Sequence, residues 1–369
     1  MSKTLYVVNS PSYIDLHPKH TLGKTLISDP LSEHFTYVYY NLLKFGLVDK
    51  VVIFPRQPDK DKHVNPPDIV LDANRRITHD FRENKFDIIN NDPGSYAFFY
   101  SNYDDCYKLK NTFVLFNPVT LTINPKNNIN KKYHHYALVE GMCHENKYQV
   151  IPKDIPKSKC PLTSNQFTNL NVEETQKTQK SYDWIMVSSL DQRKRHVEFL
   201  QSIIKNPKFR NLRGCIAARN PDNKGYLHDN HRVLKYLNEN FINKYDNIDF
   251  VMNVDNEEKI DLLSKSKIFV CTSVFDSGPR AIIEALQAGM PILTLPHIGS
   301  SDWIIPGKNG EFINQVEETQ TVLYDMIEKY DRGVYTSFSK QTSELLKPEN
   351  IYPSLIDDIR KQYKIWEST

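Results

Sequence analysis

The first part of the chain alternates short apolar runs with stretches in which apolar residues recur at helical spacing. Residues 3–10 (KTLYVVNS) and 49–55 (DKVVIFP) are apolar runs typical of buried strands. Between them, Asp29 is a good helix N-cap, Pro30 follows at the first helical position, and the helical spacing ends at Gly46. This strand, helix, strand order predicts a βαβ unit and therefore a parallel sheet.

Two later apolar runs predict further strands of the same sheet. They are residues 86–92 (FDIINND) and 111–118 (NTFVLFNP), and each leads into a loop with proline. In such sheets the loops at the carboxyl ends of the strands face ligands. We therefore expect a Rossmann-like domain over residues 1–165.

The alternation stops in a polar, proline-containing stretch and then restarts. We predict a linker over residues 166–181 and a second doubly wound α/β domain over residues 182–348. Its predicted strands are DWIMVSS, LRGCIAAR, NIDFVMNV, KIFVCTS and PILTL, and its predicted helices are RHVEFLQSII, residues 229–243, NEEKIDLLSKS and RAIIEALQ. One more amphipathic helix is predicted over residues 349–369.

Composition is that of a globular protein able to bury large cores. The chain has 369 residues, of which 39% are hydrophobic and 25% charged, with a formal net charge of +2. Because a domain usually holds roughly 100 to 200 residues, the length suggests two domains. The small net charge implies neither nucleic acid nor an anionic membrane as a partner.

Cysteine usage and the lengths of the apolar runs favour a cytoplasmic protein. The five cysteines are scattered and form no CxxC pair, which argues for reduced thiols and against a disulfide frame or a zinc site. The first apolar run lacks a small-residue cleavage site, and no apolar stretch approaches the roughly 18 residues that span a bilayer. We therefore expect a cytoplasmic location and no signal peptide.

Residues 275–292 (FDSGPRAIIEALQAGMPI) place one carboxylate inside a mostly apolar helix. The helix begins after Gly278 and Pro279, and its free N–H groups suit a phosphate. On a helical wheel Glu284 lies opposite the apolar face. It could form a surface pair with Arg280, worth about 0.2 to 0.5 kcal/mol. Alternatively, it could face a cleft and accept hydrogen bonds from a ribose diol.

The spacing from Asp276 to Glu284 resembles the E-x7-E segment of the retaining glycosyltransferases of family four. That family has the GT-B fold of two facing Rossmann-like domains, so the resemblance implies an α/β chain with an interdomain cleft and a last helix that packs back on the first domain. Further stretches resemble the family in order along the chain: VSSLDQRKRHVEFLQSI, NVDNEEKIDLLSKSKIFVCTS and LPHIGSSDWIIPGKNGEFI, the last with Gly299, Asp302, Asn309 and Gly310.

The resemblance implies roles for residues on the donor side. Glu284 would hold the donor ribose, Asp276 would lie beside the donor sugar, and Lys194 would neutralise charge on the leaving diphosphate. Backbone groups of three residues would contact the diphosphate, namely Gly278, Arg280 and Ala281.

The chain departs from the family pattern at three donor-side positions. Asp276 replaces the usual Glu and is one methylene shorter, and Pro279, which cannot donate a hydrogen bond, stands where glycine is frequent. Ser189 stands where an arginine usually precedes the lysine by five residues. Arg193 or Arg195 could supply that missing cation, or both could belong to a solvated basic turn.

The first domain carries weaker signals for an acceptor. The loop NSPSYIDLHPKHTLGKT, with Ser10 and Gly23, takes the place of the family's glycine-rich first loop. Asn117 stands at about the place where relatives carry a histidine beside the acceptor, although an Asn before Pro is also a common turn residue. Adjacent histidines in YHHY (133–136) would point to opposite faces of a strand, and CHE (143–145) has no partner cluster, so we expect no metal.

The resemblance implies a metal-independent enzyme that moves a sugar from a nucleoside diphosphate sugar to an acceptor hydroxyl with retention of configuration. The acceptor could be a glycan, a lipid or a small molecule, and no cofactor beyond the donor is implied. The basic stretch NPKNNINKK (124–132) could touch a membrane surface or be a solvated loop. Two alternatives stay open. DSGPRAIIEALQAGMPIL also resembles UDP-N-acetylglucosamine 2-epimerases, and the departures would also fit a non-catalytic GT-B module that binds a nucleotide or glycan.

Overall fold

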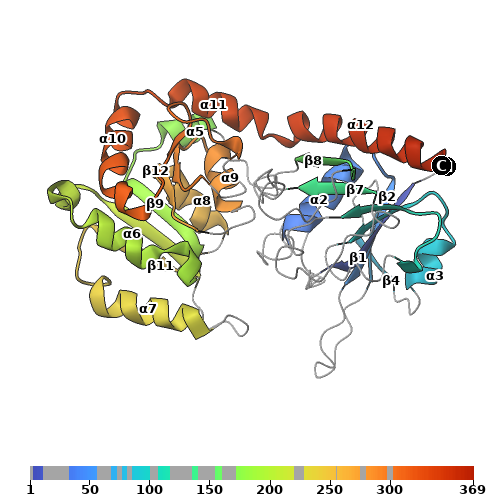
Figure 1. Cartoon of the computed structure of the whole chain (residues 1–369), viewed down its shortest axis with the longest axis horizontal. Helices are drawn as coiled ribbons and strands as arrows, with labels where there is room; N and C mark the ends of the chain where they lie inside the picture. Colours follow the sequence, from blue (N-terminus) through green and yellow to red (C-terminus); the bar gives the residue numbers. More distant parts are fainter. Residues whose placement is uncertain are drawn as a thin grey trace. The chain divides into compact units, whose positions relative to one another are not determined.

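The computed structural model describes residues 3–10, 33–55, 68–72, 77–80, 85–99, 107–116, 135–139, 154–159, 172–219, 228–254, 256–274, 280–296 and 302–369. The chain divides into two compact units. The first unit joins residues 1–167 to residues 348–369, and the second unit is formed by residues 168–347 (Figure 1).

The first unit is built on an eight-stranded sheet in the order β4-β3-β2-β1-β5-β6-β7-β8. The strands are β1 (Thr4–Ser10), β2 (Lys50–Pro55), β3 (Asp68–Asp72), β4 (Ile77–Asp80), β5 (Tyr96–Phe99), β6 (Phe113–Phe116), β7 (Tyr136–Val139) and β8 (Lys157–Lys159). Six neighbouring strands pair in parallel, in the order β2-β1-β5-β6-β7-β8. Strands β3 and β4 pair antiparallel at the edge beside β2. The strands predicted at 3–10, 49–55 and 111–118 are thus confirmed.

Both faces of this sheet are buried, as a parallel sheet requires. Alternate residues of β1 enter two different cores: Leu5 and Val7 join one cluster, whereas Tyr6 and Val8 join the other. The first cluster is completed by helices α2 (Glu33–Lys44) and α12 (Pro348–Glu367). Helix α12, at the C-terminal end of the chain, therefore belongs to the core of the first unit.

The strand predicted at residues 86–92 is wrong, because this segment contains helix α3 (Lys85–Asn90). Ile89 is buried and Phe86, one turn earlier, packs against the same cluster, so the apolar residues follow helical spacing. The strand of this region is β5, ten residues later, and all four of its residues are buried. Short apolar runs do not distinguish the two kinds of element by themselves.

The second unit has a six-stranded, fully parallel sheet in the order β11-β10-β9-β12-β13-β14. Its strands are β9 (Tyr182–Ser189), β10 (Gly214–Arg219), β11 (Ile248–Met252), β12 (Ser266–Cys271), β13 (Ile292–Thr294) and β14 (Gly310–Phe312). Its helices include α5 (Val172–Lys177), α6 (His196–Ile203), α7 (His228–Asn240), α8 (Asn256–Ser264), α9 (Arg280–Gln287), α10 (Thr319–Asp331) and α11 (Thr336–Leu345). Helices α6 and α7 lie on one side of the sheet and α8 and α9 on the other (Figure 1).

The strand order creates a topological switch point in this sheet. From β9 the chain proceeds to β10 and β11 on one side, and it then returns to β12, which pairs with β9 on the other side. The topological switch point therefore lies between β9 and β12. Open α/β sheets bind ligands at the carboxyl ends of the strands at such a point.

Part of the segment predicted as a linker is folded into the second unit. Helix α5 buries Val172 and Thr175. The ammonium group of Lys180 donates hydrogen bonds to the backbone oxygens of Thr175 (2.8 Å) and Ser264 (2.6 Å). The stretch is polar because only one edge of this short helix is buried, and composition alone therefore indicated a linker. Within the described residues, no helix is long and apolar enough to cross a membrane.

Candidate functional site

Two loops meet at the switch point of the second unit. The first follows β9 and contains the short helical turn Gln192–Lys194, and the second follows β12 and leads to α9. The hydroxyl of Thr272 donates to the backbone oxygen of Lys194 (2.8 Å), and the N–H of Val274 donates to the backbone oxygen of Arg193 (3.0 Å). The two loops follow strands that are neighbours in the sheet, and these hydrogen bonds hold the loops together.

The loop after β9 is shaped by Asp191 and Arg195. Asp191 caps the turn by accepting from the N–H of Arg193 (2.8 Å), and its carboxylate also binds the Arg193 guanidinium. Arg195 adopts a left-handed conformation (φ 55°), which is uncommon for a residue other than glycine. Of the two arginines proposed as a second cation, Arg193 is thus engaged with Asp191. Lys194 lies between them and is half-buried.

Glu284 is buried in the middle of α9, where it is 2% exposed. The ammonium group of Lys259, from α8, lies 3.0 Å from its Oε1 and 2.9 Å from its Oε2. The interpretation of Glu284 as a surface residue is therefore wrong, because the helix face opposite the sheet is covered. Gln287 is 7% exposed on α9, and it donates to the backbone oxygen of Leu346 (3.1 Å) beyond α11.

Four further predicted site residues lie in the described part of the chain. Ser189 is the last residue of β9 and is half-buried, and Ala281 is half-buried in the first turn of α9. Arg280 is the first residue of α9, and Ser10 ends β1 in the first unit. The remaining predicted residues lie outside the described part of the chain: Asp276, Gly278, Asn117 and Gly23.

Asn309 and Gly310, which sequence reasoning assigned no role, have structural functions. Asn309 is 1% exposed; its Oδ1 accepts from the N–H of Ile305 (2.6 Å), and its Nδ2 donates to Thr342 Oγ1 (2.9 Å). A Cβ on Gly310 would lie 2.4 Å from the backbone oxygen of Ile292. This pair therefore fixes the loop before β14 and permits close pairing of β14 with β13.

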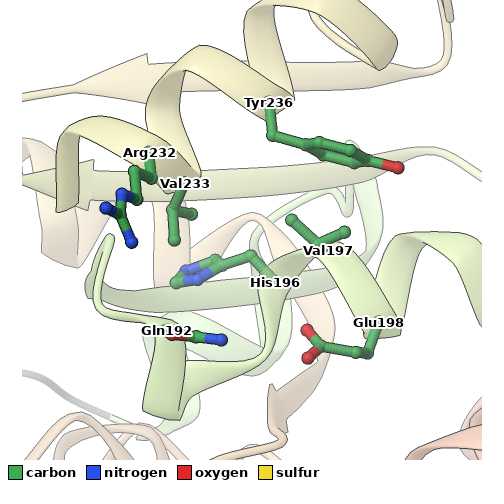
Figure 2. A pocket seen from close by; sticks show the side chains of 7 residues that line it. All are labelled: Gln192, His196, Val197, Glu198, Arg232, Val233 and Tyr236. Atoms are coloured by element: carbon green, nitrogen blue, oxygen red, sulfur yellow. The ribbon is translucent and has the colours of Figure 1, made fainter. Parts of the chain in front are cut away.

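A pocket of about 260 Å³ lies between α6 and α7, next to the turn that carries Lys194. It is lined by Gln192, His196, Val197, Glu198, Arg232, Val233 and Tyr236 (Figure 2). His196 is 1% exposed, and burial, followed by the charge of Lys194, lowers its pKa to about 3, so the ring is neutral. Its Nε2 lies 2.9 Å from Ser188 Oγ. Arg232 and Glu198 bring one positively and one negatively charged side chain to its lining.

One histidine of the YHHY stretch lies within the described residues. His135, from the predicted YHHY stretch, accepts a hydrogen bond at Nδ1 from the N–H of Val114 (2.9 Å). No group of three or more His, Cys, Asp or Glu side chains able to hold a metal occurs in the segments that the structure describes. The CHE stretch at 143–145 lies outside them.

Comparison with known proteins agrees with the architecture. Sucrose-phosphate synthase from Thermosynechococcus elongatus is similar in structure with a TM-score of 0.68 and 13% identity, over 99% of this chain and 100% of that one. A glycosyltransferase from Rickettsia africae gives 0.60 and 13%, over 98% and 99%. Anabaena HepE, solved with UDP and glucose, gives 0.57 and 10%, over 98% and 100%. No curated protein matches the sequence.

These likenesses establish the fold, which is the GT-B fold of glycosyltransferases. A more specific assignment comes from the sequence of the second unit. Residues 168–330 match the family described as glycosyl transferases group 1, and the match begins where the second unit begins. The match to this family therefore covers most of the second unit and none of the first.

Proposed function

We propose that the protein transfers a sugar from a nucleoside diphosphate sugar to an acceptor hydroxyl with retention of configuration at the anomeric carbon. The observation that carries this proposal is the junction of the two loops at the switch point, within the segment that matches the family. The bond from Thr272 to the Lys194 backbone places a lysine-bearing loop beside the loop that leads to α9. The two loops together offer a cation and a helix N-terminus to one ligand.

A nucleoside diphosphate has chemistry that suits both loops. Its diphosphate would take the N-terminus of α9 and Lys194, which stabilise the charge that develops when the sugar leaves. Glu284, one turn into α9, would accept hydrogen bonds from the ribose hydroxyls. Asp276 would lie beside the donor sugar. With fixed cations and a helix dipole at the diphosphate, the reaction needs no metal ion.

The acceptor would approach from the first unit, as the resemblance implies. The loop that starts at Ser10 and includes Gly23 follows the carboxyl end of β1, and Asn117 follows the carboxyl end of β6. The carboxyl ends of β1 and β6 lie at the edge of a parallel sheet where ligands usually bind. HepE was solved with UDP and glucose, which supports a nucleotide sugar as the donor.

The first experiment is thermal unfolding of the wild type and Glu284→Gln with UDP, GDP and ADP. A ligand at about 100 times its dissociation constant adds roughly 2.7 kcal/mol to the free energy of unfolding. We expect one nucleotide to stabilise the wild type and Glu284→Gln to lose most of that effect. A matched control is Glu311→Gln, because Glu311 also pairs with a lysine, Lys329 (3.2 Å), but lies on β14. The control variant should keep the wild-type response.

Product analysis then separates the open alternatives. Incubation of the matching nucleotide sugar with candidate acceptors, followed by NMR of the anomeric proton, should give a product with the configuration of the donor. An inverted product would overturn retention. Conversion of the donor to an epimer without an acceptor would favour the epimerase, and nucleotide binding without any turnover would favour a binding module.

A further inference from the structure

The pocket between α6 and α7 has a buried imidazole in its lining (Figure 2). His196 is 1% exposed, and its Nε2 lies 2.9 Å from Ser188 Oγ. The other ring nitrogen, Nδ1, is also buried and has no hydrogen-bond partner within the described residues. The large majority of buried polar side-chain atoms have a partner, so an exception needs an explanation. Because His196 lines the pocket, a ligand in the pocket is one such explanation.

The pocket has room for more than ordered water. Its volume is about 260 Å³, whereas the share of one water molecule in the liquid is roughly 30 Å³. Sites for drug-sized ligands measure roughly 300 to 1,000 Å³, so this pocket lies just below that range. Its volume therefore suits a small ligand with a single ring.

The state of the imidazole favours a hydroxyl group as the partner of Nδ1. Burial, followed by the charge of Lys194, lowers the pKa of the His196 ring to about 3, so the ring is neutral and carries one N–H. If that N–H is on Nε2, Nδ1 accepts a hydrogen bond, and in the other tautomer Nδ1 donates one. A hydroxyl group suits both tautomers, whereas an ionised carboxylate or a phosphate suits only the second.

The polar side chains of the lining suit a neutral molecule with several hydroxyl groups. Arg232 supplies hydrogen-bond donors, Glu198 supplies acceptors, and the amide of Gln192 supplies both. A simple anion would meet the carboxylate of Glu198, and a simple cation would meet the guanidinium of Arg232. A hydroxyl group donates and accepts, so a ring that carries several of them can use every one of these side chains.

The same pocket offers apolar surface. Val197 and Val233 line it, and Tyr236, which is 39% exposed, adds an aromatic ring (Figure 2). Gln201 of α6 donates a hydrogen bond to the hydroxyl of Tyr236 (3.0 Å), which ties this ring of α7 to α6. Apolar and aromatic side chains with a few polar groups are the usual lining of a small-molecule site. A sugar ring has both kinds of surface, because its C–H groups lie between its hydroxyl groups.

We propose that the pocket between α6 and α7 binds one sugar residue, which contacts Nδ1 of His196 and the ring of Tyr236. Helices α6 and α7 lie on one side of the sheet, and α9, where the donor nucleotide is proposed to bind, lies on the other (Figure 1). The pocket is therefore a second site, which binds a sugar and does not transfer it. The inference does not depend on the proposed transferase activity.

The test uses the full chain and four sugars as probes: D-glucose, D-galactose, D-mannose and N-acetyl-D-glucosamine. Saturation-transfer NMR gives the dissociation constant of each sugar, and a protein labelled with ¹⁵N-histidine reports on Nδ1 of His196, whose signal is assigned by its loss in His196→Gln. We expect at least one sugar to bind in the millimolar range and to shift the Nδ1 signal until the site is saturated. The shift should persist with UDP, GDP or ADP present in excess.

Variants of the exposed lining locate the bound sugar. Tyr236→Ala removes the aromatic ring and should raise the dissociation constant by about two- to tenfold. Arg232→Met should raise it by a similar factor, because it removes hydrogen bonds to the sugar. The matched controls are Tyr107→Ala, at a tyrosine of the first unit that is 59% exposed, and Arg210→Met, at an exposed arginine of the short helical turn Pro207–Asn211. Both controls should bind the sugar as the wild type does.

Four results would overturn the inference. They are no binding of any of the four sugars, binding that leaves the Nδ1 signal unchanged, an unchanged dissociation constant in Tyr236→Ala, and displacement of the sugar by a nucleotide. Displacement would place the sugar at the donor site, so it would support the proposed function while removing the second site. Conversely, a protein that binds a sugar at His196 but no nucleotide would keep this inference and lose the proposed function. If His196→Gln does not fold, the surface variants Tyr236→Ala and Arg232→Met still decide the test.

Discussion

The hydroxyl of Thr272 donates a 2.8 Å hydrogen bond to the backbone oxygen of Lys194, so the end of β12 holds the loop that follows β9. Thr272 is 1% exposed. Its bond joins segments far apart in the sequence, directly at the topological switch point. The position of Lys194 therefore depends on a neighbouring strand as well as on its own loop.

Thr272→Val should loosen this junction. Removing one buried hydrogen-bond donor should lower the free energy of unfolding by about 0.5 to 1.5 kcal/mol, and it should weaken binding of the donor nucleotide. Urea unfolding and calorimetric titration measure the two effects. Thr294→Val is the matched control. Thr294 is fully buried, and within the described residues its hydroxyl has no hydrogen-bond partner, so the change should be neutral or stabilising.

Stability should fall in acid because of His196. Burial lowers the pKa of its ring from 6.5 to about 3, so the unfolded chain binds a proton that the folded protein does not. The contribution is complete above pH about 6.5 and is lost progressively as the pH falls toward 3, by about 2 kcal/mol at pH 5. Urea unfolding between pH 5 and 7.5 should show a steeper decline for the wild type than for His196→Gln. Equal slopes would contradict a buried neutral imidazole.

Gly310→Ala should destabilise the second unit strongly. The added Cβ would meet the backbone oxygen of Ile292 at 2.4 Å and the Ile304 side chain at 2.9 Å, so strand β14 would have to move. Overpacking of this kind costs about 1 to 3 kcal/mol. Gly307→Ala, at φ 75° with no atom within 4 Å of the new Cβ, isolates the backbone strain alone. Thermal unfolding should show the larger loss for Gly310→Ala.

Cys215 should be inert in the folded protein. It is fully buried, and burial together with the charge of Asp249 raises the pKa of its thiol to about 12, so the reactive thiolate is scarce. Iodoacetamide at pH 8 followed by peptide mass spectrometry should leave Cys215 unlabelled in buffer and labelled in urea. Labelling in buffer would show that this part of β10 opens.

Ile359→Ala in α12 should destabilise the first unit. Ile359 is fully buried in the core cluster that contains Leu5 and Tyr39. Loss of such a side chain costs about 2 to 5 kcal/mol. Ile365→Ala, at a residue that is 51% exposed on the same helix, should stay within about 0.5 kcal/mol of the wild type. Denaturant unfolding monitored by circular dichroism compares the two variants.

The pattern of apolar residues was sufficient to predict most strands of the second unit, because these strands are continuous apolar runs. KIFVCTS and PILTL are such runs, and they form β12 and β13. Residues 86–92 were misassigned because a run of seven residues fits the strand period as well as the helix period, and the strand at Tyr96–Phe99 was missed beside them. The β3–β4 hairpin was also missed.

The environment of Glu284 could not be read from its own helix. The wheel correctly separated it from the apolar face, but the partner that buries it, Lys259, lies 25 residues earlier on α8. Likewise, the bond from Asn309 to Thr342 joins residues 33 apart. Local periodicity carries no information on which helix covers a polar face. The contacts of Glu284 and Asn309 could therefore be identified only in the tertiary structure.

Because α12 belongs to the first unit, the chain enters the second unit and then returns to the first. Residues 168–347 are bracketed on both sides by segments of one unit, so the second unit is an insertion and the chain passes between the units at two points. A fragment that stops at residue 347 keeps the whole segment that matches the family but lacks Tyr352, Ile356 and Ile359 from the core of the first unit. The first unit is thus discontinuous in the sequence, and its core is complete only when the residues of α12 have been synthesised.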